Sequence, residues 1–207
     1  MPRPFSDHEK SLIQAALLEK GGAIFAAYGL RKTSIDDLAS AVGISKGAFY
    51  LFYDSKESLY LDILARFEAD YRRKMLDILS EPGRSPRQAL GTMLQASIHE
   101  WKTNPLFQRF SKEEYALLLR KIPPENLAEM LGEDRDFSVI LLDHLKETGA
   151  LLKTTPEQAA NLMKVLFLIS LHEDDFGPAA LSDTLDLLIE MTLDQILGKE
   201  EEHELHL

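Results

Sequence analysis

The segment of residues 33–60 constrains this chain more than any other, because signals for starting and stopping helices follow one another there at short intervals. Ser34 is a candidate N-cap, and Asp37, three residues later, completes a capping box, so a helix is expected to begin directly after Ser34. Gly43 supplies the positive φ that commonly ends a helix. Ser45 is a second N-cap candidate, which predicts another short helix after a tight turn.

The second helix is expected over residues 46–53, with Phe49 and Tyr53, one turn apart, facing the core. Its other side combines a positive charge, two small side chains and a phenol. Such a face suits a DNA major groove, because small residues let the backbone approach the bases and a basic side chain can meet guanine or phosphate. A helical hairpin with a glycine turn also occurs in many other α-helical proteins, and the glycine spacing alone favours that interpretation. The residues of this side are Lys46, Gly47, Ala48 and Tyr50.

The complete segment of residues 33–60 favours DNA binding over an ordinary helical hairpin, because it resembles the DNA-binding domain of the tetracycline-repressor (TetR) family of transcriptional regulators. The resemblance implies an all-α protein. It would have an N-terminal three-helix helix-turn-helix domain over residues 1–55, a C-terminal helical domain for ligand binding and dimerisation over residues 56–198, and an acidic tail over residues 199–207. The matching residues are Thr33, Ser34, Asp36, Asp37, Ala39, Gly43, Ser45, Lys46, Gly47, Phe49, Tyr50, Ser55, Lys56, Glu57 and Leu59.

The resemblance also implies DNA contacts for individual residues. Hydroxyl groups would bind phosphates, the start of the second helix would meet the floor of the groove, and Tyr50 and Lys56 would hold the DNA backbone. The chain departs from the family pattern at Phe52, where His is frequent, and at Asp54, which adds a negative charge between two expected phosphate contacts. The DNA-binding residues expected in this way are Thr33, Ser34, Ser45, Lys46, Gly47, Ala48, Tyr50 and Lys56.

The net charge of −11 is unusual for a DNA-binding protein until it is divided along the chain. Residues 1–60 hold seven of the 23 Lys and Arg and seven of the 34 Asp and Glu, so their charges balance. All the excess acid therefore lies in residues 61–207, where it would repel phosphate and keep that part of the chain off the duplex. Solubility alone explains the excess equally well.

The rest of the chain shows only helical patterns. The pattern after Lys56 continues to Leu79 without a proline, which predicts one long helix joining the two domains. Further helices are expected from Pro86 towards Trp101 and over residues 106–120, 124–149 with a break near Gly132, 156–173 and 178–198.

The last two predicted helices are more apolar than a single core-facing side requires. By resemblance they would pair with the same helices of a second subunit in a four-helix bundle, which would place two recognition helices about 34 Å apart, as successive major grooves need. The alternative is a central helix buried within its own monomer. The expected dimer-interface residues are Leu162, Leu166, Ile169, Leu181, Leu185, Leu188, Thr192 and Ile196.

Aromatic and other large side chains between these regions are candidates for the wall of a ligand cavity. The resemblance implies that the second domain binds a small apolar inducer, although aromatic residues at helical spacing are more often ordinary core. The expected pocket residues are Phe67, Tyr71, Met93, Trp101, Phe110, Tyr115, Phe137, His144 and Phe167.

Residue patterns for catalysis are weak. The run from His172 to Asp175 resembles a metal cluster, but consecutive residues at a helix end point in different directions, so a solvated terminus is the better interpretation. His203 and His206 lie in the acidic tail. We expect no enzymatic activity, no cofactor and no metal site. The chain has no cysteine and no apolar run long enough for a membrane span, which favours a cytoplasmic location.

The sequence thus predicts a homodimeric transcriptional repressor that binds a pseudo-palindromic operator in double-stranded DNA and is released by a small molecule. An alternative keeps DNA binding but has no inducer. In that case, the chain would be a ligand-independent scaffold that recruits a protein partner through its acidic second domain.

Overall fold

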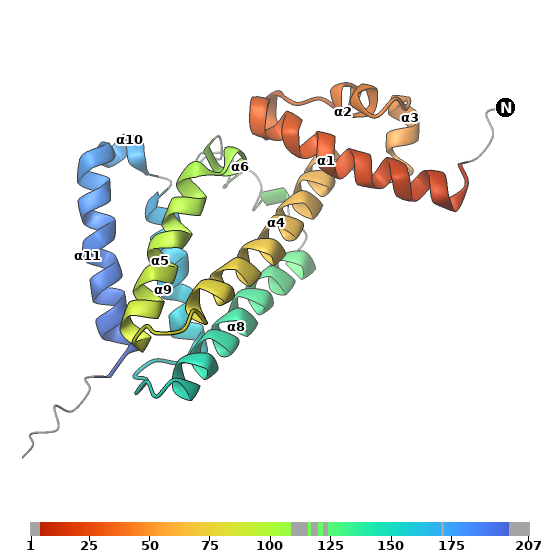
Figure 1. The fold of residues 1–207 in the computed structure, drawn as a ribbon. Helices are drawn as coiled ribbons and strands as arrows, with labels where there is room; N and C mark the ends of the chain where they lie inside the picture. The colour runs from red at the N-terminus through yellow and green to blue at the C-terminus, as the bar shows by residue number, and fades with distance from the viewer. Residues whose placement is uncertain (1–4, 109–115, 117–119, 122–123, 171, 199–207) are drawn as a thin grey trace, which may run out of the picture. The chain divides into compact units, whose positions relative to one another are not determined.

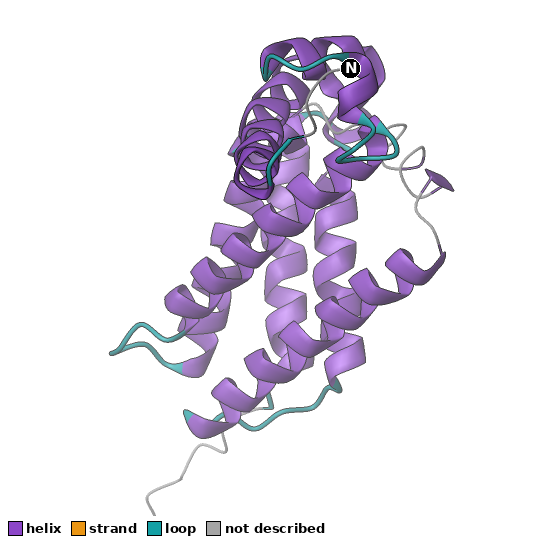
Figure 2. Ribbon diagram, turned by 90° about the vertical axis from the view of Figure 1, so that its right-hand side faces the viewer, coloured by secondary structure: helices purple, strands orange, loops and turns teal. Residues whose placement is uncertain are grey.

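The computed structural model describes residues 5–108, 116, 120–121, 124–170 and 172–198. This part of the chain is helical, and its β-structure is limited to an isolated antiparallel bridge between Leu152 and Leu197 (Figure 2). The predicted all-α class is therefore confirmed. The helices are α1 (Asp7–Lys32), α2 (Ile35–Ala41), α3 (Lys46–Phe49), α4 (Lys56–Leu79), α5 (Pro86–Thr103), α6 (Pro105–Gln108), α8 (Pro124–Glu147), α9 (Pro156–Ser170), α10 (Glu173–Phe176) and α11 (Pro178–Ile196) (Figure 1).

The chain divides into two compact units. Unit 1 comprises residues 1–71 and 103–121, and unit 2 comprises residues 72–102 and 122–207. The long helix α4, predicted from the uninterrupted apolar pattern, begins in unit 1 and ends in unit 2. Its buried side chains include Leu59 in the first unit and Met75 in the second. One continuous helix thus contributes to the core of both units.

In unit 1, α1 is the longest helix and α2 packs along it (Figure 1). Ser6 begins α1 with a capping box, in which its hydroxyl accepts the Glu9 amide hydrogen and its own amide donates to the Glu9 carboxylate. Near its end the helix is kinked at Gly29, whose φ of 77° and ψ of 167° are accessible almost only to glycine. This kink redirects the chain towards α2.

The side of α1 that faces α4 is closely packed at Gly21. A Cβ atom at this position would lie 3.2 Å from Leu59 Cδ2 of α4 and 3.6 Å from Leu38 Cδ2 of α2. Four residues later, Phe25 meets Tyr60 edge to face, with ring centroids 4.9 Å apart. Gly21 therefore allows three helices to approach one another.

In unit 2, α9 packs against both α8 and α11, and α10 packs against α11. Helix α5 joins α11 through Arg87, whose guanidinium donates to the carboxylates of Glu190 at 2.6 Å and Asp194 at 2.7 Å. Between α5 and α4, the buried Ser97 hydroxyl contacts Met75 Sδ at 3.1 Å. The contact of Ser97 with Met75 places the C-terminal part of α4 in the core of unit 2.

Several expected helix boundaries differ in the structure. Helix α8 runs through Gly132 without the expected break. The helix expected over residues 156–173 ends at Ser170 and is followed by the short α10, after which Gly177 turns with φ 78°. Of the helix expected over residues 106–120, the structure describes α6 and only isolated later positions. The acidic tail, including His203 and His206, lies outside the described residues.

Gly21 is closely packed and the neighbouring Gly22 is not, so substitutions at the two positions should have opposite effects on stability. Gly21→Leu should lower the free energy of unfolding by about 1–3 kcal/mol, because the side chain has no space against α4. Gly22→Ala should raise it by about 0.5–1 kcal/mol, because a Cβ there meets Ile63 Cγ2 at an ordinary 3.6 Å and a helical glycine is replaced. Urea denaturation followed by circular dichroism measures both. Equal effects at the two positions would contradict this account of the packing.

Candidate DNA-recognition site

The start of α2 has the geometry that the sequence predicts. The Ser34 hydroxyl accepts the Asp37 amide hydrogen at 3.1 Å, and the Ser34 amide donates to Asp37 Oδ2 at 3.0 Å, which completes the capping box. The hydroxyl also donates to the same carboxylate oxygen at 2.6 Å. These hydrogen bonds, the Ser34 hydroxyl first, lower the pKa of Asp37 from its ordinary value. A side-chain cap of this kind contributes about 1 kcal/mol to a helix.

The turn after α2 and the beginning of α3 also follow the prediction. Gly43 has φ 75°, and the Ser45 hydroxyl accepts the Ala48 amide hydrogen at 3.1 Å. However, α3 ends at Phe49 and is therefore shorter than the expected helix over residues 46–53. The chain continues as turns, in which the Phe52 amide donates to the Phe49 carbonyl at 2.9 Å. The side chains after Phe49 are thus positioned by turns instead of by a continuing helix.

Two aromatic residues fix this segment to the core of unit 1. Phe49 and Tyr53 are both buried, as expected from their spacing. The Tyr53 hydroxyl donates to Asp62 of α4 at 2.6 Å. Burial, followed by this hydrogen bond, raises the pKa of Tyr53 to about 12, so the phenol stays neutral and remains a donor. The buried side therefore orients the opposite side of α3 towards solvent.

The exposed side contains most of the residues that the sequence singled out. Ser45, Lys46, Gly47 and Tyr50 are exposed, whereas Ala48 is half-buried. Leu51 is also largely exposed and joins this surface, although the sequence did not identify it as a DNA-binding residue. Its position two residues after the buried Phe49 is the signal that indicates its exposure.

Two further expected DNA contacts have other partners in this structure. Thr33 is only 3% exposed, and its hydroxyl donates to the Gly29 carbonyl at 2.8 Å, so it does not present a hydroxyl to phosphate. The Lys56 ammonium donates to the carbonyls of Leu30 and Thr33, both at 2.7 Å, and to that of Arg31 at 3.3 Å. Lys56 therefore binds the C-terminal end of α1, where carbonyls lack helical partners.

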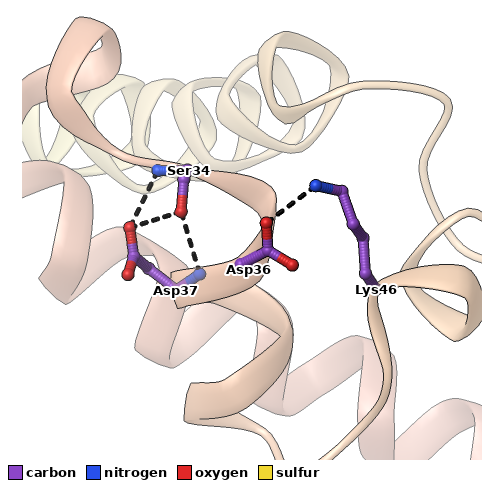
Figure 3. A network of polar contacts seen from close by, with 4 residues as sticks. All are labelled: Ser34, Asp36, Asp37 and Lys46. Carbon is purple, nitrogen blue, oxygen red and sulfur yellow. Dashed lines mark hydrogen bonds and ion pairs between the residues drawn. The ribbon is translucent and has the colours of Figure 1, made fainter.

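Lys46 is exposed but forms an ion pair. Its ammonium lies 2.7 Å from Asp36 Oδ2, across the turn between α2 and α3 (Figure 3). The hydrogen bond with Asp36 raises the pKa of Lys46 from its ordinary value, so the side chain stays positively charged at neutral pH. Ser34, also an expected DNA contact, is exposed, with its hydroxyl already engaged by Asp37.

The expected pocket residues are distributed over different parts of the chain. Phe67 and Tyr71 stack in unit 1 with ring centroids 6.0 Å apart. In unit 2, Trp101 of α5 and Phe167 of α9 meet edge to face at 5.1 Å. The other described pocket candidates in unit 2 are the buried Met93 and Phe137 and the half-buried His144, whereas Phe110 and Tyr115 lie outside the described residues. The assignment of these side chains to a cavity stays a prediction.

The expected dimer-interface residues fall into two groups. The side chains of Leu162, Ile169 and Leu188 are half-buried. The other five are buried in the single protomer, so a second subunit would not meet them in this conformation. They are Leu166, Leu181, Leu185, Thr192 and Ile196.

The described residues contain no group of three or more His, Asp or Glu side chains placed to hold a metal ion. His172, part of the weak cluster in the sequence, contacts Asp175 at 2.6 Å. Among the same residues, no helix is long and apolar enough to cross a membrane.

Comparison with known proteins agrees with this geometry. Residues 17–63 match the family model of bacterial regulatory proteins, tetR family. The HTH-type transcriptional repressor KstR2 of Rhodococcus jostii is 36% identical over 97 residues, which cover 46% of this chain and 47% of that protein. The chain spans between 32% and 47% of the length of three such curated relatives.

Solved structures extend the similarity to most of the chain. A TetR-family regulator from Pectobacterium atrosepticum has a TM-score of 0.73 and 22% identity, covering 94% of this chain and 99% of its own. Thermus thermophilus FadR, a TetR-family repressor solved in complex with lauroyl-CoA, has a TM-score of 0.60 and 20% identity, covering 91% and 97%. With the helix-turn-helix geometry, these similarities assign the N-terminal helix-turn-helix domain and the C-terminal helical domain to one known fold. Residues 17–63 therefore carry the domain of bacterial regulatory proteins of the tetR family, and the chain shares the fold of solved TetR-family structures.

Proposed function

We propose that this protein is a transcriptional repressor that binds a pseudo-palindromic operator as a homodimer and releases it when a small apolar ligand binds. The observation that carries the proposal is the exposed side of α3, where small side chains leave the backbone accessible. Its exposed residues are Ser45, Lys46, Gly47 and Tyr50. The buried Phe49 fixes the orientation of this side. A helix start of this kind can enter a major groove, with hydroxyl and ammonium groups placed for phosphates and base edges.

Dimerisation is supported by apolar side chains that the protomer leaves exposed. On α11, Leu187 is 62% exposed and Met191, one turn later, is 58% exposed. Val165 adds an exposed apolar side chain on α9, which packs against α11 within the same unit. We therefore place the interface on this surface, in preference to the predicted stripe that begins at Leu181. A two-fold contact there would present two recognition helices to two half-sites.

The course of α4 supports release by a ligand. Because this helix contributes buried residues to both units, a ligand that displaces its C-terminal part would change the separation of the two recognition helices in the dimer, which must match successive major grooves. A ligand acts in this way only if it binds the released state more tightly, and a hundredfold preference supplies about 2.7 kcal/mol of coupling. The complex of Thermus thermophilus FadR with lauroyl-CoA supports the choice of a lipophilic ligand.

The first test is selection of bound sequences from random duplex DNA. The wild-type protein should enrich a palindromic motif. The variant Lys46→Ala/Tyr50→Ala should not enrich it, because it lacks the cation and the phenol of the exposed side. Enrichment that is the same with both proteins would remove the assignment of α3 as the recognition helix. Once a motif is known, anisotropy measurements with lipophilic acyl compounds test ligand release.

The two lysines of the site should respond differently to substitution. Lys56→Met should lower the free energy of unfolding by about 1.5–3 kcal/mol, because carbonyls at the end of α1 lose a charged donor. Lys46→Met should change stability by less than about 0.5 kcal/mol, as is usual for exposed side chains. It should also reduce the slope of log affinity against log salt, by less than the value of about 0.9 expected for a free cation, because the ammonium is already paired with Asp36.

Thermal melts and DNA titrations at several salt concentrations measure these two effects. If Lys56→Met instead changed only the salt slope, Lys56 would be a DNA contact, as the family resemblance implied.

The proposed interface predicts a change of oligomeric state. Leu187→Glu/Met191→Glu should convert a dimer into a monomer, because two carboxylates would be buried without partners. The matched control is Ile140→Glu, which changes a 53% exposed apolar residue of α8 and should leave the dimer intact. Light scattering after size-exclusion chromatography measures the mass. A wild-type monomer, or a double variant that remains dimeric, would contradict the proposed interface.

A further inference from the structure

Two adjacent acidic residues in the first turn of α2 have different partners. Asp37 makes the capping contacts with Ser34 and so fixes the start of the helix. Asp36 points the other way along the surface, and its Oδ2 atom meets the ammonium of Lys46 at 2.7 Å (Figure 3). The contact joins residues ten positions apart, at the end of the turn where the exposed side of α3 begins. The cap of α2 is thus made by Asp37, and Asp36 is available to bind the lysine.

The ion pair is open to solvent and can be exchanged. The side chains of Lys46 and Asp36 are 53% and 63% exposed. Exposed ion pairs of this kind contribute little to stability, because water and salt screen them. Asp36 therefore binds the Lys46 ammonium in an ion pair that can dissociate readily.

A DNA phosphate offers Lys46 the same chemistry as this carboxylate. Both are anionic oxygen acceptors that an ammonium binds through a charge-assisted hydrogen bond. Lys46 lies between Ser45 and Gly47 on the exposed side of α3, so a duplex at that surface brings its acceptors to an ammonium that already has an anionic partner.

We propose that Asp36 is an intramolecular competitor for the DNA acceptor of Lys46 and thereby sets the strength of DNA binding and its dependence on salt. This inference rests on the proposed function. While the pair is intact, it presents no net charge to the duplex, so the lysine contributes less to counterion release than an unpaired lysine. Removing the carboxylate should free the ammonium for DNA.

The test is a double-mutant cycle with Asp36→Asn and Lys46→Met, using fluorescence anisotropy and a duplex that carries the selected motif. Asp36→Asn should tighten binding by about two- to fivefold at 50 mM salt, the size expected for release of one exposed pair. It should also steepen the log–log salt slope by up to about 0.9, so that up to about 3.5-fold more affinity is lost between 50 and 200 mM salt. In the Lys46→Met background, the gain from Asp36→Asn should fall by at least half.

The control is Asp7→Asn, which removes an exposed acid from the first turn of α1, where it pairs with Lys10 at 3.6 Å. This variant has the same net charge as Asp36→Asn and should bind DNA like the wild type. Circular dichroism melts of all variants check that α2 remains folded.

The outcomes separate the two proposals. Equal gains from Asp36→Asn in both backgrounds would show simple charge repulsion and overturn the competition. Weaker binding by Asp36→Asn would show that Asp36 positions Lys46, and it would overturn the competition as well. Wild-type protein that binds no duplex in the selection would instead overturn the proposed function, together with the inference that depends on it.

Discussion

The binding of the Lys56 ammonium to the end of α1 is the contact on which the recognition site depends. The helix-turn-helix occupies the chain between Thr33 and Lys56, and the 2.7 Å hydrogen bond between the Lys56 ammonium and the Thr33 carbonyl joins its two ends. Closing a loop of this length costs conformational entropy, which a charge-assisted hydrogen bond offsets in part. The Thr33 hydroxyl, bound to the Gly29 carbonyl, fixes the same junction from the other side. This closure joins the ends of the segment in which the buried Phe49 and Tyr53 orient α3.

The local features of the site could be predicted from the sequence because each depends on residues within one helical turn. The caps at Ser34 and Ser45 and the left-handed turn at Gly43 are of this kind, and the structure confirms all three. The role of Lys56 could not be predicted in the same way, because its partners lie at the end of α1, up to 26 residues away. A lysine in a family motif has the same sequence signal whether it binds phosphate or a helix end.

The apolar patterns of the C-terminal helices show a similar limit. Periodicity correctly indicates that α11 is apolar on more than one side, but it does not say which side the protomer buries. The stripe through Leu181 and Leu185 is buried within the protomer, and the neighbouring Leu187 and Met191 stay exposed. The choice depends on how α11 meets α5 and α9, through contacts such as that of Arg87 with Glu190 and Asp194. Those contacts connect residues more than 100 positions apart. Composition alone does not determine them.

The positive charges of the site are balanced by acidic residues or already bound to acceptors within the protein. The helix-turn-helix segment owes little of its DNA affinity to net charge, because basic and acidic residues balance over residues 1–60. Of the two lysines expected to meet DNA, one is bound to backbone carbonyls and the other to a carboxylate. Sequence-independent attraction to phosphate grows with the number of free cations, so this arrangement keeps it weak. In the proposed function, binding then depends more on contacts that only a matching sequence provides, such as those we propose for Tyr50 and the small residues of α3. The proposed release by a ligand benefits from this balance, because the coupling free energy needs to overcome only the specific contacts.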